Sequence, residues 1–232
     1  PSQLVQDARR HGVEVRPVDA TTSDWECTLE PSLSSPGRGN GGADRGVRPA
    51  VRLGFLVVHG LSEEGAKRIV GARKRQPFQS TENLAHRAAL DRRDLKCLAA
   101  AGALEALSGH RRYAYWEVAG IETGAPVLHG APVAETRPSL FAPSEGETLV
   151  ADYASTGLTL GRHPLALLRP RLSRLRFATA DELKRLPGGA RARAAGIVTG
   201  RQRPGTASGT VFVTLEDETG YINVIVCDKQ KH

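Results

Sequence analysis

The sequence predicts an α+β protein of more than one domain, mainly helical at first and β-stranded from about residue 190. Apolar residues recur at helical spacing through residues 51–116. From Ala190 onward apolar and polar residues alternate, which is typical of half-buried strands. Two stretches rich in Gly, Pro and small residues, 31–50 and 120–146, separate these regions and predict linkers.

The first thirty residues predict a short helix and an edge strand. Residues 2–10 place three apolar side chains on one helical face, and Gly12 follows as a stop signal. Residues 13–18 then alternate apolar and polar side chains until Pro17 interrupts the pattern, which favours the edge of a sheet.

Residues 51–116 predict helices joined by tight glycine turns, and the arrangement of helix, turn and helix occurs twice. The first turn is Gly60-Leu61-Ser62, and Ser62 is placed to cap a helix from about Glu63 to Lys74. Ser80 or Thr81 is placed to cap the next helix, and Asp91 the one after it. The second turn is centred on Gly102.

Both glycine turns predict phosphate recognition, because a tight turn into a helix N-terminus aims free backbone N–H groups at an anion. Basic side chains follow the first turn and are placed to hold neighbouring phosphates. An ordinary αα-hairpin that uses glycine only for its left-handed turn remains the alternative. The predicted DNA-binding residues of this region are Gly60, Leu61, Ser62, Lys67, Arg73, Lys74 and Gly102.

Positive charge is concentrated in one part of the chain. The net charge is +7, yet residues 151–203 alone hold 11 basic and 3 acidic residues. This stretch includes two predicted helices, 147–155 and 164–175, and a shorter one that ends before Pro187. Confined positive charge favours a polyanionic partner such as nucleic acid, with a merely solvated arginine-rich face as the alternative.

Three strands are predicted at 191–199, 211–216 and 221–227, with a basic loop at 200–209 that carries Arg201 and Arg203. The alternation places valines, leucine and isoleucine on one face. Phe212 and Tyr221 therefore lie on the opposite, outer face of adjacent strands. Aromatic side chains on an open face predict a platform on which nucleic-acid bases stack.

No catalytic or metal-binding motif stands out, so the chain by itself is not predicted to be an enzyme or to bind a cofactor. Asp217 and Glu218 are expected turn residues, with metal binding as the less favoured alternative. The three cysteines lie far apart, which favours a reducing cytoplasm over a disulfide-linked secreted protein. No apolar run is long enough to predict a membrane span.

Several motifs resemble those of a known family. Residues 150–165 read VADYASTGLTLGRHPL, residues 202–207 read QRPGTA, and residues 212–220 read FVTLEDETG. Together with HGVEVRPVD at 11–19 and VHGLSEE at 58–64, they resemble the alpha subunit of bacterial DNA polymerase III, and most closely its error-prone, damage-induced translesion branch.

The resemblance implies a tandem helix-hairpin-helix domain followed by an incomplete OB-fold β-barrel. The implied segments are the end of the polymerase fingers (1–30), a linker (31–50), the helix-hairpin-helix domain (51–118), a second linker (119–146), a basic helical connector (147–189) and the first three OB-fold strands (190–232). The catalytic palm with its Mg²⁺ ions is then expected upstream of Pro1, so this fragment is expected to be inactive alone. The absence of any Met agrees with a piece of a longer chain.

The implied function is to grip primer-template duplex through the hairpins and single-stranded template through the OB-fold, where Arg201, Arg203, Phe212 and Tyr221 are the predicted contacts. The family's hairpin has glycine at the position of Ser62, which weakens the expectation of phosphate binding there. RNA binding by an unrelated OB-fold protein is the least favoured alternative.

A protein-interaction module that docks the sliding clamp or accessory translesion proteins is the main rival. In replicative relatives a clamp-binding motif lies between the two modules, and residues 137–141 here read RPSLF. This segment keeps Leu140 and Phe141 and lacks the leading Gln. Clamp binding by this pair is therefore a secondary hypothesis, with a linker that carries an incidental apolar pair as its alternative.

Overall fold

A computed structural model of the chain describes residues 2–32, 49–121, 138–205 and 209–227. Contacts between residues divide the chain into two compact units, residues 1–160 and 161–232. The division falls within the predicted connector at 147–189. The boundaries of the six segments predicted from the sequence stay a prediction, and each unit is described by itself.

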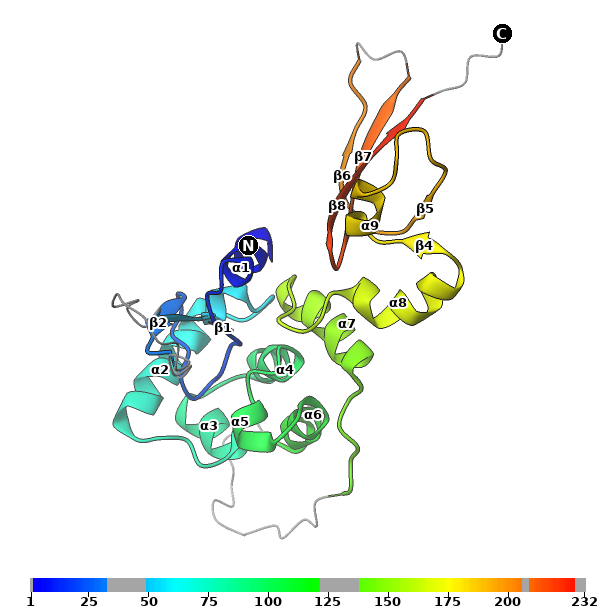
Figure 1. The fold of residues 1–232 in the computed structure, drawn as a ribbon. Coiled ribbons are helices and arrows are strands. Elements are labelled where there is room, and N and C mark those ends of the chain that lie inside the picture. The colour runs from blue at the N-terminus through cyan, green and yellow to red at the C-terminus, as the bar shows by residue number, and fades with distance from the viewer. Residues whose placement is uncertain (1, 33–48, 122–137, 206–208, 228–232) are drawn as a thin grey trace, which may run out of the picture. The chain divides into compact units, whose positions relative to one another are not determined.

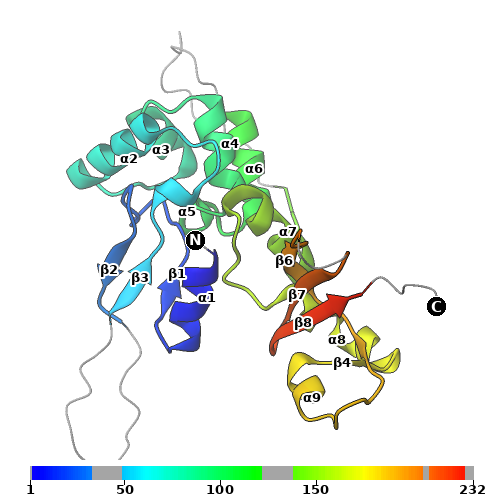
Figure 2. The same cartoon turned by 90° about the horizontal axis from the view of Figure 1, so that it is seen from above.

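Unit 1 begins with a helix and a small sheet. Helix α1 (Ser2–Arg10) precedes strands β1 (Val15–Arg16), β2 (Thr28–Glu30) and β3 (Ala50–Arg52). Strand β3 lies in the middle, parallel to β1 and antiparallel to β2 (Figure 2). The sheet therefore joins the start of the helical region to residues that precede it by more than twenty positions.

The helices of unit 1 follow the order predicted from the sequence. Ser62, Ser80 and Asp91 each accept a backbone hydrogen bond at the start of a helix, which confirms them as N-caps. The elements are the 3₁₀ helix η1 (Phe55–Val57) and helices α2 (Glu63–Arg75), α3 (Thr81–Arg87), α4 (Arg92–Ala100), α5 (Glu105–Ser108), α6 (Arg111–Gly120) and α7 (Glu145–Thr156).

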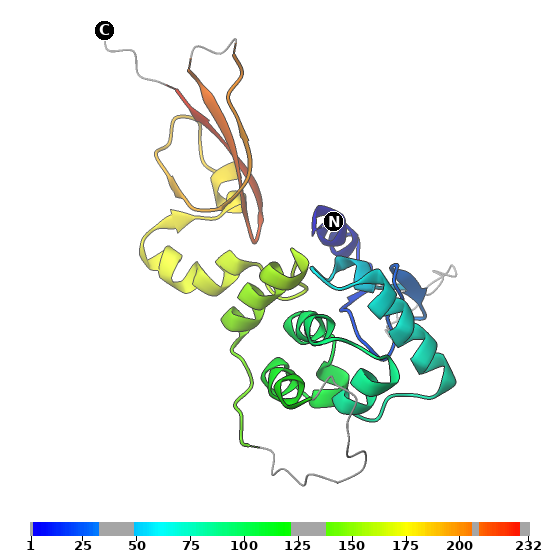
Figure 3. The ribbon, with the colours of Figure 1, turned by 180° about the vertical axis from the view of Figure 1, so that it is seen from behind.

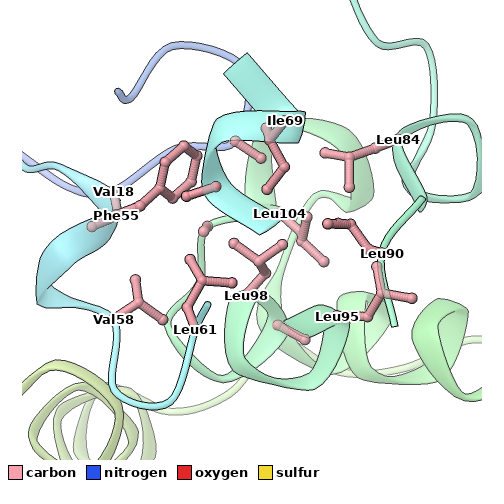
Figure 4. Packing of buried hydrophobic residues seen from close by; sticks show 14 of the residues in the cluster. Val18, Phe55, Val58, Leu61, Ile69, Leu84, Leu90, Leu95, Leu98 and Leu104 are labelled. Atoms are coloured by element: carbon pink, nitrogen blue, oxygen red, sulfur yellow. The ribbon is translucent and has the colours of Figure 1, made fainter. Parts of the chain in front are cut away.

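A single apolar core holds these helices together. Side chains from η1, α2, α3 and α4 point toward one another between the helices (Figure 4). Phe55, Ile69, Leu84, Leu95 and Leu98 are all fully buried. Helix α7 lies against α4 and α6 at the side of this bundle (Figure 3).

Unit 2 combines short helices with an antiparallel three-stranded sheet and a parallel pair of short strands (Figure 1). Strand β7 is central in a sheet of order β6-β7-β8, and β4 pairs with β5. The described strands form no closed barrel, so the incomplete OB-fold stays a prediction, whereas the α+β class is confirmed. The elements are α8 (Pro164–Arg174), β4 (Phe177–Ala178), α9 (Ala180–Lys184), β5 (Arg193–Ala194), β6 (Ile197–Gln202), β7 (Val211–Asp217) and β8 (Gly220–Val226).

Two details of unit 2 differ from the sequence-based prediction. The predicted strand at 191–199 is divided into β5 and β6. Strand β6 continues to Gln202, so Arg201 lies in a strand rather than in a loop. The strand is longer than predicted because its pairing with β7 continues to Gln202, which is opposite Phe212, and the register shifts between Val198 and Gly200.

Candidate nucleic-acid interface

The first hairpin joins η1 to α2 through Gly60, whose backbone is left-handed at φ +81°. Ser62 caps α2 by accepting a hydrogen bond from the amide of Gly65 at 3.0 Å. The buried carboxylate of Asp94, on α4, accepts from both the amide and the hydroxyl of Ser62, at 3.0 and 2.8 Å. The hairpin is therefore fastened to α4 by two hydrogen bonds to one carboxylate.

Three backbone amides at this hairpin remain available. Within the described residues, the N–H groups of Gly60, Glu63 and Glu64 donate to no protein acceptor. A Cβ added to Gly60 would lie 3.9 Å from the guanidinium of Arg93, so this side chain lies beside the turn. Free amides next to an exposed cation form a suitable site for a backbone phosphate.

The basic residues predicted after this hairpin have different surroundings. The Lys67 ammonium pairs with Glu63 at 2.7 Å. Arg73 is half-buried and donates to the carbonyl of Ser23 and to Asp24, both at 2.8 Å, so it fastens α2 to the N-terminal segment. Lys74 is exposed and forms no ion pair with a described residue.

Arg93 was not predicted from the sequence, because it lies more than thirty residues from Gly60 along the chain. Its neighbours Arg92 and Lys96 are also exposed on α4 and, like Arg93, form no ion pair within the described part. The only signal for Arg93 in the sequence was the spacing of Arg92, Arg93 and Lys96 on one predicted helix.

The second hairpin, between α4 and α5, has the same left-handed glycine, Gly102 at φ +71°. Three of its amides are already bonded, because Gly102 donates to Ala99, Ala103 to Leu98 and Glu105 to Gly102, at 3.2, 3.0 and 3.1 Å. A Cβ added to Gly102 would meet Glu105 Oε1 at 2.9 Å and an Arg111 nitrogen at 3.0 Å. Two charged side chains therefore cover this turn.

Arg111 is 5% exposed and faces helix α7. It donates to the carbonyl of Thr148 at 3.0 Å and to the carboxylate of Asp152 at 2.6 Å. Its Nε is buried without a partner among the described residues. Burial raises the pKa of the neighbouring Glu105 carboxyl, and the positive charge of Arg111 only partly offsets this effect.

In unit 2 the motif at 216–220 forms a hydrogen-bonded lock around Asp217. The fully buried Asp217 accepts from the amide and hydroxyl of Thr219, the amide of Gly220 and the amide of Ala180, at 2.7 to 3.0 Å. Arg169 pairs with Glu218. Among the described residues of the whole chain, no three His, Cys, Asp or Glu side chains are grouped to hold a metal ion.

The predicted aromatic face is present on β7 and β8. Phe212 is opposite Ile225 and Tyr221 is opposite Glu216, so both aromatic residues lie on the same face, and each is 40% exposed. Four residues of strand separate their rows, or about 13 Å. Ile225, which is 60% exposed beside Phe212, extends the apolar surface and was missed from the sequence.

The arginines predicted for this surface do not lie beside the aromatic residues. Arg201 is opposite Val213 and therefore projects from the other face of the sheet. Arg203 is exposed beyond the end of β6. The arginines of unit 2 that form no ion pair with a described residue are Arg171, Arg174, Arg176, Arg185, Arg191, Arg193, Arg201 and Arg203.

The segment around Leu140 lies on α6 in unit 1. The Tyr113 hydroxyl donates to the carbonyl of Pro138 and accepts from the amide of Leu140, at 2.8 and 3.3 Å. Arg112 donates to the carbonyl of Phe141 at 3.2 Å, while the Phe141 side chain is 84% exposed. Arg137, the first residue of the predicted motif, lies outside the described residues.

Comparisons with known proteins identify the relatives of this chain. The sequence profile described as "Helix-hairpin-helix motif" matches residues 12–114, which include both glycine turns.

None of the helices in the described ranges is long and apolar enough to cross a membrane.

Three curated relatives are named error-prone DNA polymerase. Those of Azoarcus sp. (strain BH72) and Alkalilimnicola ehrlichii are 58% and 54% identical to the chain over 226 residues. That of Methylococcus capsulatus is 54% identical over 232 residues. The matches cover 97% of this chain but only 21–22% of each relative. The chain is thus homologous, over nearly its whole length, to about a fifth of relatives named error-prone DNA polymerase, and it carries a helix-hairpin-helix motif.

Proposed function

We propose that this chain is a DNA-gripping portion of an error-prone, translesion DNA polymerase. The single observation that carries the proposal is the 58% identity to such a polymerase over 97% of the chain. Unit 1 holds the backbone of the primer-template duplex, and unit 2 contacts the single-stranded template. Nucleotide transfer, with its Mg²⁺ ions, is assigned to residues of the polymerase outside this chain.

The contacts of the first hairpin support duplex binding by unit 1. The amides of Gly60, Glu63 and Glu64 and the guanidinium of Arg93 together offer donors to one phosphate group. Such contacts carry no base-sequence information, which suits a polymerase that must accept any template.

The test is the salt dependence of duplex binding, measured by fluorescence anisotropy. Each phosphate contact adds about 0.9 to the slope of log K against log salt on duplex DNA. Arg93→Gln is expected to lower the slope by about that amount. Arg75→Gln is the matched control, because Arg75 ends α2, about 20 Å along the helix from the hairpin. Equal slopes for Arg93→Gln and the unmodified chain would reject this contact.

The outer face of β7 and β8 supports single-strand binding by unit 2. Stacking on an aromatic ring stabilises each base by about 1–3 kcal/mol. Phe212→Ala and Tyr221→Ala are therefore each expected to weaken single-strand binding roughly fivefold or more while sparing duplex binding. Val213→Ala, on the opposite face, is the control. Equal loss on both kinds of DNA would contradict the stacking assignment.

A second candidate function is docking of the sliding clamp or an accessory protein. The observation that favours it is the Phe141 side chain, which is almost fully exposed on a backbone held to α6 by hydrogen bonds. Leu140→Ala combined with Phe141→Ala is expected to abolish clamp capture without changing DNA affinity. Unchanged clamp capture would exclude this segment, and salt-insensitive partner binding without DNA affinity would favour the docking function over the DNA grip.

A further inference from the structure

We propose that the second hairpin does not contact DNA, because helix α7 occupies it as an internal ligand, with the Asp152 carboxylate in the place of a backbone phosphate. The inference rests on the proposed duplex binding by unit 1 and assigns that binding to one of its two hairpins. Helix α7 is then a structural part of the DNA-binding unit, and its role there is to occupy the second hairpin.

The contacts of Arg111 carry the first step. Arg111 begins α6, directly after the short α5, and lies within reach of Gly102. In a phosphate-binding hairpin such a guanidinium would be exposed toward the DNA. Here it is 95% buried, and its donors meet an oxygen of Asp152 at 2.6 Å and the carbonyl of Thr148 at 3.0 Å, both on α7.

The surroundings of Asp152 hold its carboxylate in that position. One oxygen accepts from Arg111, and the other accepts from the hydroxyl of Thr159 at 2.8 Å. Asp152 thus presents one negatively charged oxygen to Arg111, as a phosphate oxygen would, and its other oxygen is held by Thr159.

Charge around the second hairpin disfavours an added phosphate. A cavity of about 190 Å³ lies beside Gly102, lined among others by Asp19, Glu105, Arg111 and Asp152. The lining thus includes three acidic residues and one basic residue. A phosphate placed in this cavity would be repelled by the unmatched carboxylates, and these groups are poorly shielded because they are partly buried.

The two hairpins differ in their free donors as well as in charge. At the first, the amide of Gly60 is unpaired among the described residues and Arg93 is exposed. At the second, the amide of Gly102 is bonded to Ala99, and the helix that follows has only four residues. A helix this short has a weak dipole, so the second turn also offers less positive potential to an anion.

Helix α7 contacts the entrance of the first hairpin too, which gives its position a second anchor. The amide of His59, just before Gly60, donates to the carbonyl of Ser155 at 2.7 Å. The helix therefore covers the second hairpin with its middle and approaches the first with its C-terminal end, while leaving the amide of Gly60 unbonded.

Two variants of the full 232-residue chain test the proposal. Glu105→Gln removes a negative charge that a phosphate at Gly102 would feel at about 4 Å. If a phosphate bound there, duplex affinity would rise about fivefold or more. The expected result, at pH 8 in low salt, is unchanged affinity and an unchanged salt slope. A rise in affinity would overturn the proposal.

Asp152→Asn removes the internal ligand and needs no DNA in its assay. The midpoint of urea unfolding, followed by the fluorescence of Trp25 and Trp116, is expected to fall. Sulfate, replacing chloride at constant ionic strength, should then raise the midpoint more than in the unmodified chain, because the freed Arg111 accepts an anion. Asp181→Asn, on α9, is the control for general salting effects. An unchanged midpoint in Asp152→Asn would reject Asp152 as an internal ligand.

The outcomes separate this inference from the proposed function. If the unmodified chain binds no duplex, the DNA grip fails, while the Asp152→Asn result still decides whether α7 occupies the second hairpin. If Arg93→Gln lowers the salt slope and Glu105→Gln strengthens binding, the DNA grip stands and the internal ligand is rejected. If Asp152→Asn fails to fold, Glu105→Gln alone decides.

Discussion

Replacing Asp217 with Asn should open the strands of unit 2 while leaving unit 1 intact. The carboxylate is 1% exposed and accepts five hydrogen bonds: two from Thr219, one each from Gly220 and Ala180, and a longer one from Arg169 at 3.4 Å. These bonds hold the β7–β8 turn and fasten it to the start of α9. The described part of unit 2 buries few apolar side chains, Leu165 and Ala180 among them, so this polar lock matters more than it would beside a large core.

The magnitude follows from the contacts. An amide keeps one acceptor oxygen but turns an NH₂ group toward the buried amide of Ala180, which then lacks a partner at a cost of about 1–3 kcal/mol. The bonds from Thr219 and Gly220 lose the strengthening by charge, about 1 kcal/mol each. The expected total is about 4–6 kcal/mol, which is a large fraction of the stability of a small unit.

Hydrogen exchange followed by mass spectrometry measures this loss directly. In Asp217→Asn, amides in peptides that cover 211–226 should lose protection by about a hundredfold or more. The two tryptophans, Trp25 and Trp116, both lie in unit 1, so their fluorescence should report an unchanged unfolding midpoint. Asp181→Asn, which removes only an exposed pair with Lys184, is the control. Equal protection in the two variants would refute the lock.

The lock also predicts an acid dependence. Burial by itself raises the pKa of Asp217, but hydrogen bonds from Thr219, Ala180 and Gly220 outweigh it, and the net effect is a pKa below the ordinary value of 3.8. Its contribution to folding is therefore present above about pH 4 and is lost as the pH falls through the lowered pKa. The Asn variant should lack this part of the acid dependence.

Three further predictions concern unit 1. Burial raises the pKa of Glu105, so its ionised carboxylate opposes folding. Glu105→Gln should therefore raise the midpoint of urea unfolding at pH 7, and this gain in stability should vanish below about pH 4.5. A gain that persists at pH 3.5 would contradict this cause. The hydrogen bond from Arg52 lowers the pKa of Glu30, and the one from Arg16 adds a smaller effect. Glu30→Gln should therefore lower the free energy of unfolding by about 1 kcal/mol at pH 7 and leave it unchanged below the lowered pKa, as measured by thermal unfolding. Gly60→Ala should lower the free energy of unfolding by about 1–2 kcal/mol, because a φ of +81° strains an L-residue and the new Cβ would lie 3.2 Å from Cys97 Sγ. An unchanged melting temperature would show that the turn relaxes.

Local signals were sufficient to predict much of the secondary structure. Ser62, Ser80 and Asp91 cap helices as expected, because an N-cap depends on the next three residues only. The alternation in β7 and β8 placed Phe212 and Tyr221 on one face for a similar reason, since side-chain direction in a strand has a period of two.

Features that depend on partners distant in sequence were not predicted. The pairing of Arg111 with Asp152 joins α6 to α7 across forty residues, and no local pattern marks it. Arg201 was predicted in a loop, but it lies in strand β6 opposite Val213, on the face of the sheet away from Phe212. Arg93 was not predicted because it reaches Gly60 through the packing of α4 against the hairpin, which the sequence near Gly60 does not indicate.

The two glycine turns show why a repeated motif does not imply a repeated contact. Gly60 and Gly102 have nearly the same backbone conformation, at φ +81° and +71°, so the sequence and the local geometry treat them alike. They differ in what packs against them: exposed Arg93 beside the first, and buried Arg111 already paired with Asp152 beside the second. A carboxylate supplied by the protein satisfies the same donors that a phosphate would, and it does so without the loss of translational freedom that binding a separate molecule requires. In the proposed DNA grip, the second hairpin therefore keeps its shape as a structural joint, and only the first is expected to contribute to the salt dependence of binding.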